Sequence, residues 1–163
     1  MTWLVVIVVL VALLASWTTW TATRVDRLHS RVDLARAALD AQLVRRAAAV
    51  QALVDRAPER LGGRPAGRLR SAARAALDAD DGVRESAEND LSRALQDLPA
   101  DLEPALLQDL ADASTRVLLA RRFYNDAVRD TRALRGRWLP RLLHLGGRRP
   151  VPTFFEIDEV TPG

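Results

Sequence analysis

The chain has 163 residues and a formal net charge of +3, from 24 basic and 21 acidic side chains, and it has no cysteine. That length fits one domain plus an appendage, and the lack of cysteine excludes disulfide bonds, a thiol nucleophile and a thiolate metal site. Every basic residue is arginine, and Ala, Leu, Val and Arg dominate while Gly, Tyr and Phe are scarce. Such a composition favours helices over sheets.

The amino-terminal segment, residues 1–23, has no charged side chain, and residues 3–15 are an unbroken apolar run. A helix from Trp3 to Trp20 would be about 26 Å long, close to the hydrocarbon core of a bilayer, with Trp at both edges. A secretory signal peptide fits less well, because no basic residue precedes the run and no small-x-small site follows it. A buried core helix also fits less well, because the segment is apolar on all sides. The sequence predicts a transmembrane anchor.

The charges that flank this anchor predict its orientation. Arg24, Arg27 and Arg31 follow the apolar run closely, and no basic side chain precedes it. The positive-inside bias then places the amino terminus outside and the bulk of the chain in the cytoplasm. We expect a single-pass protein of the inner or plasma membrane.

A first long helix is predicted over residues 25–57, and no breaker separates it from the anchor, so it can continue the anchor helix. Pro58 is expected to end it, because the residue before proline is pushed out of the helical region. Residues 60–68 are expected to form a loop; their Gly-rich spacing resembles a phosphate loop but lacks the Lys and hydroxyl that contact phosphate. The apolar stripe of the helix is Val25, Leu28, Val32, Ala35, Leu39, Leu43, Val50 and Val54.

The middle region, residues 69–98, is interrupted at residues 80–82. Asp81 is expected to cap its second half. Glu85 and Glu88 stand about one turn apart in that half, but no Glu-x-x-His partner is present, so we expect them on a solvated face. Asp101 is the expected N-cap of the next helix, with Pro104 in its first turn.

The last long helix has the clearest pattern, because its apolar positions alternate steps of four and three residues. A seven-residue repeat of this kind predicts the seam of a helical bundle or coiled coil. Gly136 or Pro140 is expected to end the helix. The seam consists of Leu106, Leu110, Ala113, Val117, Ala120, Tyr124, Ala127, Thr131 and Leu134.

Together these elements predict an all-α protein: an N-terminal transmembrane helix followed by an antiparallel bundle of three long helices, with four as the alternative. In the preferred three-helix geometry, the two middle pieces together match one long helix in length. The predicted domains are the anchor over residues 1–23, the bundle over residues 24–137, and an irregular basic tail with an acidic end over residues 138–163.

Segment 124–128, Tyr-Asn-Asp-Ala-Val, preceded by Ala120 and Arg121, resembles the signature of the LemA family. Residues 39–46 and 88–95 resemble the family's first helix and middle segment, residues 155–156 resemble its carboxyl-terminal ending, and an amino-terminal anchor is a family feature. Thr131 and Arg132 stand where the family often has a second Tyr-Asn, so the chain resembles a divergent, Arg-rich member. The resemblance implies a membrane-anchored cytoplasmic helical bundle, without catalytic, cofactor or metal residues to carry over.

The charge distribution suggests three kinds of contact for the carboxyl-terminal part. Residues 116–149 contain ten Arg against Asp126 and Asp130, a balance of +8. This excess fits a solvated face offset by neighbouring acids, contact with anionic lipid, or an acidic protein partner. Nucleic acid is not expected, because stacking aromatic residues are sparse. With three helices the tail would lie away from the membrane, whereas with four it would return to it.

No catalytic, cofactor or metal site is expected, since His29 and His144 lack carboxylates at ligand spacing and no Ser/His/Asp order appears. The sequence therefore predicts a non-enzymatic scaffold or adaptor that acts through protein–protein contacts. The alternative is a module that binds anionic lipid or another polyanion through the Arg-rich last helix and tail. The oligomeric state is left open. Tyr124 is expected in the core, and the candidate partner-docking residues are Arg121, Arg122, Asn125, Asp126 and Arg129.

Overall fold

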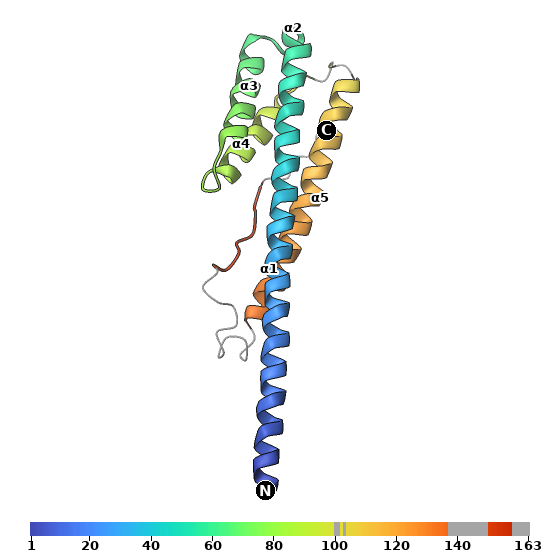
Figure 1. Cartoon of the computed structure of the whole chain (residues 1–163). Coiled ribbons are helices and arrows are strands. Elements are labelled where there is room, and N and C mark those ends of the chain that lie inside the picture. The colour runs from blue at the N-terminus through green and yellow to red at the C-terminus, as the bar shows by residue number, and fades with distance from the viewer. Residues whose placement is uncertain (100–101, 103, 137–149, 158–163) are drawn as a thin grey trace. The chain divides into compact units, whose positions relative to one another are not determined.

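The computed structural model describes residues 1–99, 102, 104–136 and 150–157, and all regular elements in this part of the chain are helices. Figure 1 shows them in chain order. The all-α prediction is confirmed for these residues, whereas the expected cap Asp101 and most of the basic tail lie outside them. The elements are α1 (Thr2–Arg56), α2 (Pro58–Leu61), α3 (Gly63–Asp78), α4 (Arg84–Gln96) and α5 (Pro104–Arg135).

Two compact units divide the chain. The first consists of Met1–Ala35 with Asn125–Phe154, and the second consists of Arg36–Tyr124 with Phe155–Gly163. Helices α1 and α5 each contribute one part to each unit. We call the first the anchor unit and the second the core unit, and describe each by itself.

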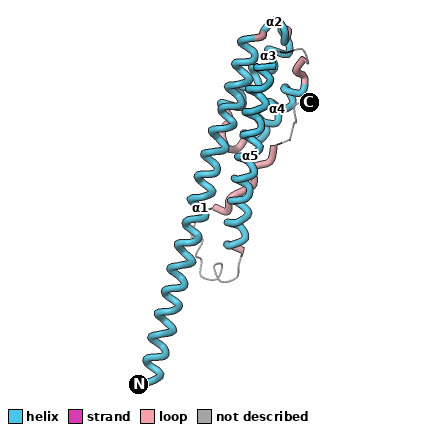
Figure 2. The backbone as a smooth tube through the Cα atoms, turned by 90° about the vertical axis from the view of Figure 1, so that its right-hand side faces the viewer, coloured by secondary structure: helices cyan, strands magenta, loops and turns pink. Residues whose placement is uncertain are grey.

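Helix α1 continues without interruption from Thr2 to Arg56 (Figure 2). The sequence explains this continuity, because neither Gly nor Pro occurs between those residues. The helix ends two residues before Pro58, as expected, with the Ala57 N–H still bonded to the Leu53 carbonyl at 3.1 Å. Its amino-terminal part is long and apolar enough to cross a membrane, and none of that apolar window is buried.

In the core unit, α3 and α4 pack side by side as a helical hairpin (Figure 1). This corrects the expectation that the two middle pieces follow one another as one broken helix. The chain reverses at residues 80–82 because the Asp80 carboxylate accepts the Gly82 N–H at 3.0 Å and the Asp80 carbonyl accepts the Val83 N–H at 3.2 Å. Asp81 is not the cap of α4, which has no side-chain cap bond; it pairs with Arg36 of α1 at 2.5 Å.

Within this unit, one cluster of buried apolar residues includes positions from α1, α2, α3, α4 and α5. The residues facing the core are small on α3 and α4, which lets the helices approach closely. The buried residues of α3 are Leu69 and three alanines, Ala66, Ala73 and Ala76. The core comprises Ala47, Val50, Leu53, Val54, Leu61, Ala66, Leu69, Ala73, Ala76, Ala87, Leu91, Ala94, Leu102 and Leu110, with Ala57 and Ala79 at its edge.

The link between α1 and α3 is shorter than expected, and the predicted loop over residues 60–68 is wrong. Pro58 begins α2 and Pro65 lies in the first turn of α3, positions where proline removes no helical hydrogen bond. Only Gly62 separates the two helices, with φ 72° and ψ 159°, a conformation open essentially to glycine alone. The Gly-rich segment is therefore helical and does not form a phosphate loop.

The four-three seam predicted for the last helix is confirmed at most positions. Ala113 and Ala120 are half-buried. Gly136 ends the helix as expected, with its N–H bonded to the Arg132 carbonyl at 2.9 Å. The buried seam residues of α5 are Leu110, Val117, Tyr124, Ala127, Thr131 and Leu134.

Candidate functional sites

The core unit contains a buried ion pair between Arg46 of α1 and Glu88 of α4. Glu88 is fully buried and Arg46 is 6% exposed. Nη2 of Arg46 contacts Oε2 of Glu88 and also the Glu88 carbonyl at 3.4 Å, and Nη1 donates to the hydroxyl of buried Ser92 at 3.4 Å. The cluster therefore ties the middle of α1 to one face of α4.

Burial raises the pKa of the Glu88 carboxyl, although the positive charges of Arg46 and Arg84 act in the opposite direction. Oε1 of Glu88 has no hydrogen-bond partner among the described residues, so only one carboxylate oxygen is satisfied by a side chain. An incompletely satisfied carboxylate away from water is costly to ionise. Because solvent does not reach the Glu88 carboxylate, we interpret its pair with Arg46 as structural.

Placing Glu88 on a solvated face with Glu85 was wrong. Glu85 is half-buried and its Oε1 accepts the Glu156 N–H at 3.0 Å. The sequence does carry a signal for the buried pair, because Glu88 precedes Leu91 by three residues on the apolar stripe of α4. Arg46 likewise fills the gap between Leu43 and Val50 on the stripe of α1. Among the described residues, no three His, Asp or Glu side chains gather closely enough to hold a metal ion.

The five candidate docking residues divide between the two units. In the core unit, Arg121 is half-buried and donates from Nη1 to the Ile157 carbonyl at 3.2 Å, whereas Arg122 is exposed. In the anchor unit, Asp126 and Arg129 are exposed and form an ion pair at 2.5 Å, and Asn125 is half-buried. Arg122 is thus the candidate of the core unit that is most open to a partner.

Sequence reasoning missed two exposed apolar residues on α5 of the core unit. Leu119 is 52% and Phe123 62% exposed, and they stand one helical turn apart on the same face. Arg116 and Arg122 are exposed on the same helix and flank the pair. Neither apolar residue belongs to the four-three seam, and this position could have indicated from the sequence that both are exposed. We call Arg116, Leu119, Arg122 and Phe123 the α5 patch.

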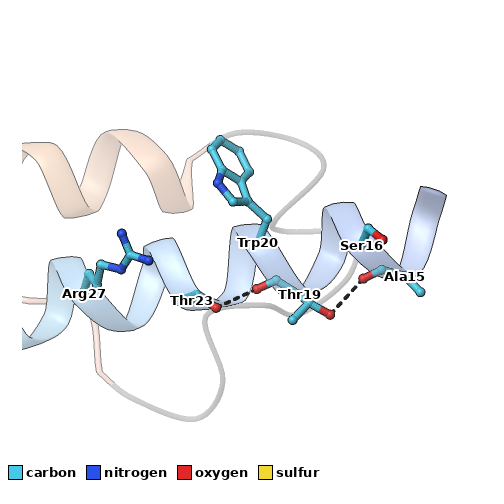
Figure 3. Close-up of a pocket in the computed structure, with 6 residues that line it drawn as sticks. All are labelled: Ala15, Ser16, Thr19, Trp20, Thr23 and Arg27. Carbon is cyan, nitrogen blue, oxygen red and sulfur yellow. Dashed lines mark hydrogen bonds between the residues drawn. The ribbon is translucent and has the colours of Figure 1, made fainter. Parts of the chain in front are cut away.

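In the anchor unit, the end of the apolar segment forms an open recess of about 480 Å³ on α1. Figure 3 shows that Trp20 and Arg27 extend toward the same side of the helix. The hydroxyls of Thr19 and Thr23 donate to the backbone carbonyls of Ala15 and Thr19, each at 2.8 Å, so both hydroxyl protons are used within the helix. The lining consists of Ala15, Ser16, Thr19, Trp20, Thr23 and Arg27.

The carboxyl-terminal end of α5 lies beside α1 just past this recess, within the same unit. Arg31 pairs with Asp130 at 3.7 Å, and Nη1 of Arg135 approaches Nε2 of buried His29 at 3.5 Å. Arg135 also donates to the Pro150 carbonyl at 3.2 Å. The last turns of α5 therefore contact α1 about one to two helical turns beyond Arg24.

Searches of the chain against protein-family models, curated proteins and solved structures find no match. The resemblance to the LemA family rests on the sequence segments quoted above.

Proposed function

We propose that this chain is a single-pass membrane protein of LemA type whose helical bundle lies in the cytoplasm and acts as a non-enzymatic scaffold or adaptor. It works through contacts with another protein. The observation that carries the proposal is the exposed Leu119–Phe123 pair, because large apolar side chains that a helix leaves in water are stabilised when a partner covers them.

The anchor is supported by the wholly exposed apolar part of α1. No described residue of the chain covers this segment, and its length matches a bilayer core. The amino terminus is placed outside because Arg24, Arg27 and Arg31 follow the segment and no basic side chain precedes it. The bundle then lies on the cytoplasmic side.

The α5 patch favours a partner of particular chemistry. Leu119 and Phe123 offer an apolar ridge one turn long, and the exposed guanidiniums of Arg116 and Arg122 stand on either side of it. An amphipathic helix with apolar residues at i and i+4 and acidic residues beside them would match both features. The candidate residues Asp126 and Arg129 satisfy one another and contribute less to such contact.

In-membrane photocrosslinking tests this function. A photoreactive residue replaces Phe123, and a control carries it at the exposed Arg74 of α3. We expect one recurrent protein adduct from position 123 and none of the same mass from position 74. Identical adducts at both positions, or none at either, would contradict the adaptor function.

A second function, binding of anionic lipid by the Arg-rich end of α5 and the tail, gains support from the fold. The three-helix geometry argued against it, but the Arg31–Asp130 and Arg135–His29 contacts bring the last turn of α5 beside the membrane-proximal part of α1. A fragment that begins at Arg24 should then float with anionic liposomes at low salt and be released at high salt. A fragment that never floats excludes this function.

A further inference from the structure

We infer that the anchor unit holds the phosphate of an anionic membrane lipid in the recess between Trp20 and Arg27. The inference rests on the proposed membrane anchor and adds a ligand and a site to it. The residues of this site all belong to α1, so the site is separate from the Arg-rich last helix and tail.

Depth in the bilayer is the first argument. The apolar run ends at Ala15, and the next eight residues are only Ser, Thr, Trp and Ala. Trp20 is 59% exposed at this boundary, where indole rings sit at the level of lipid headgroups. Arg27 follows seven residues later, which is about 10 Å farther along the helix on the same face. Arg27 is therefore on the aqueous side of Trp20, close to the level of the lipid phosphates.

The hydrogen-bond donors of the recess are the second argument. The Thr19 and Thr23 hydroxyls already donate to backbone carbonyls, so they offer no proton to an anion. The Trp20 indole N–H, the Ser16 hydroxyl and the Arg27 guanidinium remain as donors that line the same recess (Figure 3). A guanidinium binds two phosphate oxygens at once in a geometry that an ammonium cannot match.

The local charge is the third argument. Arg24 lies over the Trp20 ring, with its guanidinium carbon 5.6 Å from the ring centroid, a contact that favours this orientation of the ring. Neither Arg24 nor Arg27 forms an ion pair with a described residue, whereas the next arginine, Arg31, pairs with Asp130. Arg24 and Arg27 outnumber the one acidic residue beside them, Asp26, and this net positive charge near the headgroups favours an anionic lipid over a zwitterionic one.

The test uses the full chain in nanodiscs that contain phosphatidylglycerol in phosphatidylcholine, with retained lipid measured by native mass spectrometry after extraction. We expect Arg27→Gln to lower retention of phosphatidylglycerol about tenfold, as loss of a charge-assisted hydrogen bond implies. Trp20→Phe, which keeps the ring but removes the N–H, should lower it less. Arg31→Gln removes the same charge outside the recess and should change retention less than twofold.

Equal losses in Arg27→Gln and Arg31→Gln would overturn the site, because they would reflect only general attraction to the surface. Displacement of the lipid by excess inorganic phosphate would also overturn it, since the site would then bind a free anion. Insertion into pure phosphatidylcholine vesicles, scored by resistance to alkaline carbonate, is measured on the same samples. A chain that fails to insert contradicts the anchor, and a chain that inserts without preferring phosphatidylglycerol contradicts the lipid site alone.

Discussion

Arg46 and Glu88 form a buried ion pair, with Glu88 fully buried and one of its oxygens left without a partner among the described residues. The pair joins α1 to α4 beside a core of alanine, leucine and valine. Desolvation of two charges in such a place offsets most or all of their attraction, so the pair specifies which faces of the helices meet more than it adds stability.

Removing one partner of this pair should be far more damaging than removing both. Arg46→Met leaves a buried carboxylate without its cation and should lower the free energy of unfolding by about 3–5 kcal/mol. The double variant Arg46→Met/Glu88→Met should recover most or all of that loss. Denaturant unfolding of the full chain in mild detergent, followed by circular dichroism, measures both. If the double variant is as unstable as the single one, the ion pair contributes more than this reasoning allows.

The raised pKa of Glu88 predicts the sign of a pH dependence. Burial makes the folded chain bind this proton more readily than the unfolded chain does, and the nearby charges of Arg46 and Arg84 only partly oppose that effect. Glu88 therefore contributes stability at low pH that is lost as pH rises from about 4.3, the pKa of an unfolded Glu, through the higher folded pKa.

Glu88→Gln removes this titration and serves as the reference. The unfolding free energy of the wild type, taken relative to Glu88→Gln, should fall as pH rises from about 4.3 through the raised pKa of the folded chain. Parallel denaturant titrations at several pH values measure the difference. If the unfolding free energy of the wild type instead rises relative to that of Glu88→Gln as pH increases, pairing with Arg46 outweighs burial.

Gly62 is expected to be intolerant of any side chain. Its φ of 72° and ψ of 159° place it in a region that costs other residues about 1–3 kcal/mol, so Gly62→Ala should lower the unfolding free energy by that amount. The neighbouring Gly63, at the start of α3, has no positive φ and no atom within 4 Å of an added Cβ. Gly63→Ala should thus be neutral or slightly stabilising, and equal losses in the two variants would contradict the backbone argument.

Phe123 should matter for contact with a partner and not for folding. Phe123→Ser changes an exposed side chain, so the unfolding free energy should stay within about 0.5 kcal/mol of wild type, while co-purification of the crosslinked partner should fall severalfold. Val44→Ser, at an exposed position on α1 of the same unit, is the matched control and should keep the partner. Loss of the partner in both variants would point to general surface hydrophobicity.

The helices could be predicted where local chemistry decides them. Pro58 and Gly136 mark the ends of α1 and α5, residues 80–82 mark the break between α3 and α4, and the four-three seam identifies the buried face of α5. The start of α3 could not be placed, because Gly and Pro also suit loops and only the packing of Ala66 and Leu69 against the core decides for a helix. That is a tertiary effect with no local signal.

The sites were less predictable than the fold. Arg46 and Glu88 look like surface residues by type, and only their positions on two apolar stripes indicate burial. Asn125 and Asp126 stand out by residue type, whereas the exposure of Phe123 depends on which face of α5 the rest of the core unit leaves open. Within the anchor unit, the Arg31–Asp130 and Arg135–His29 contacts join residues about 100 positions apart, and no single segment specifies such long-range contacts.

The membrane topology is the central claim and can be measured directly, because the chain has no cysteine and any single introduced thiol can be labelled alone. Thr2→Cys and Glu59→Cys place thiols at exposed positions before and after the apolar segment. A membrane-impermeant maleimide should label Thr2→Cys in intact cells, and Glu59→Cys only after the cells are permeabilised. Labelling of Glu59→Cys in intact cells with protection of Thr2→Cys, or release of either variant by alkaline carbonate, would contradict the account.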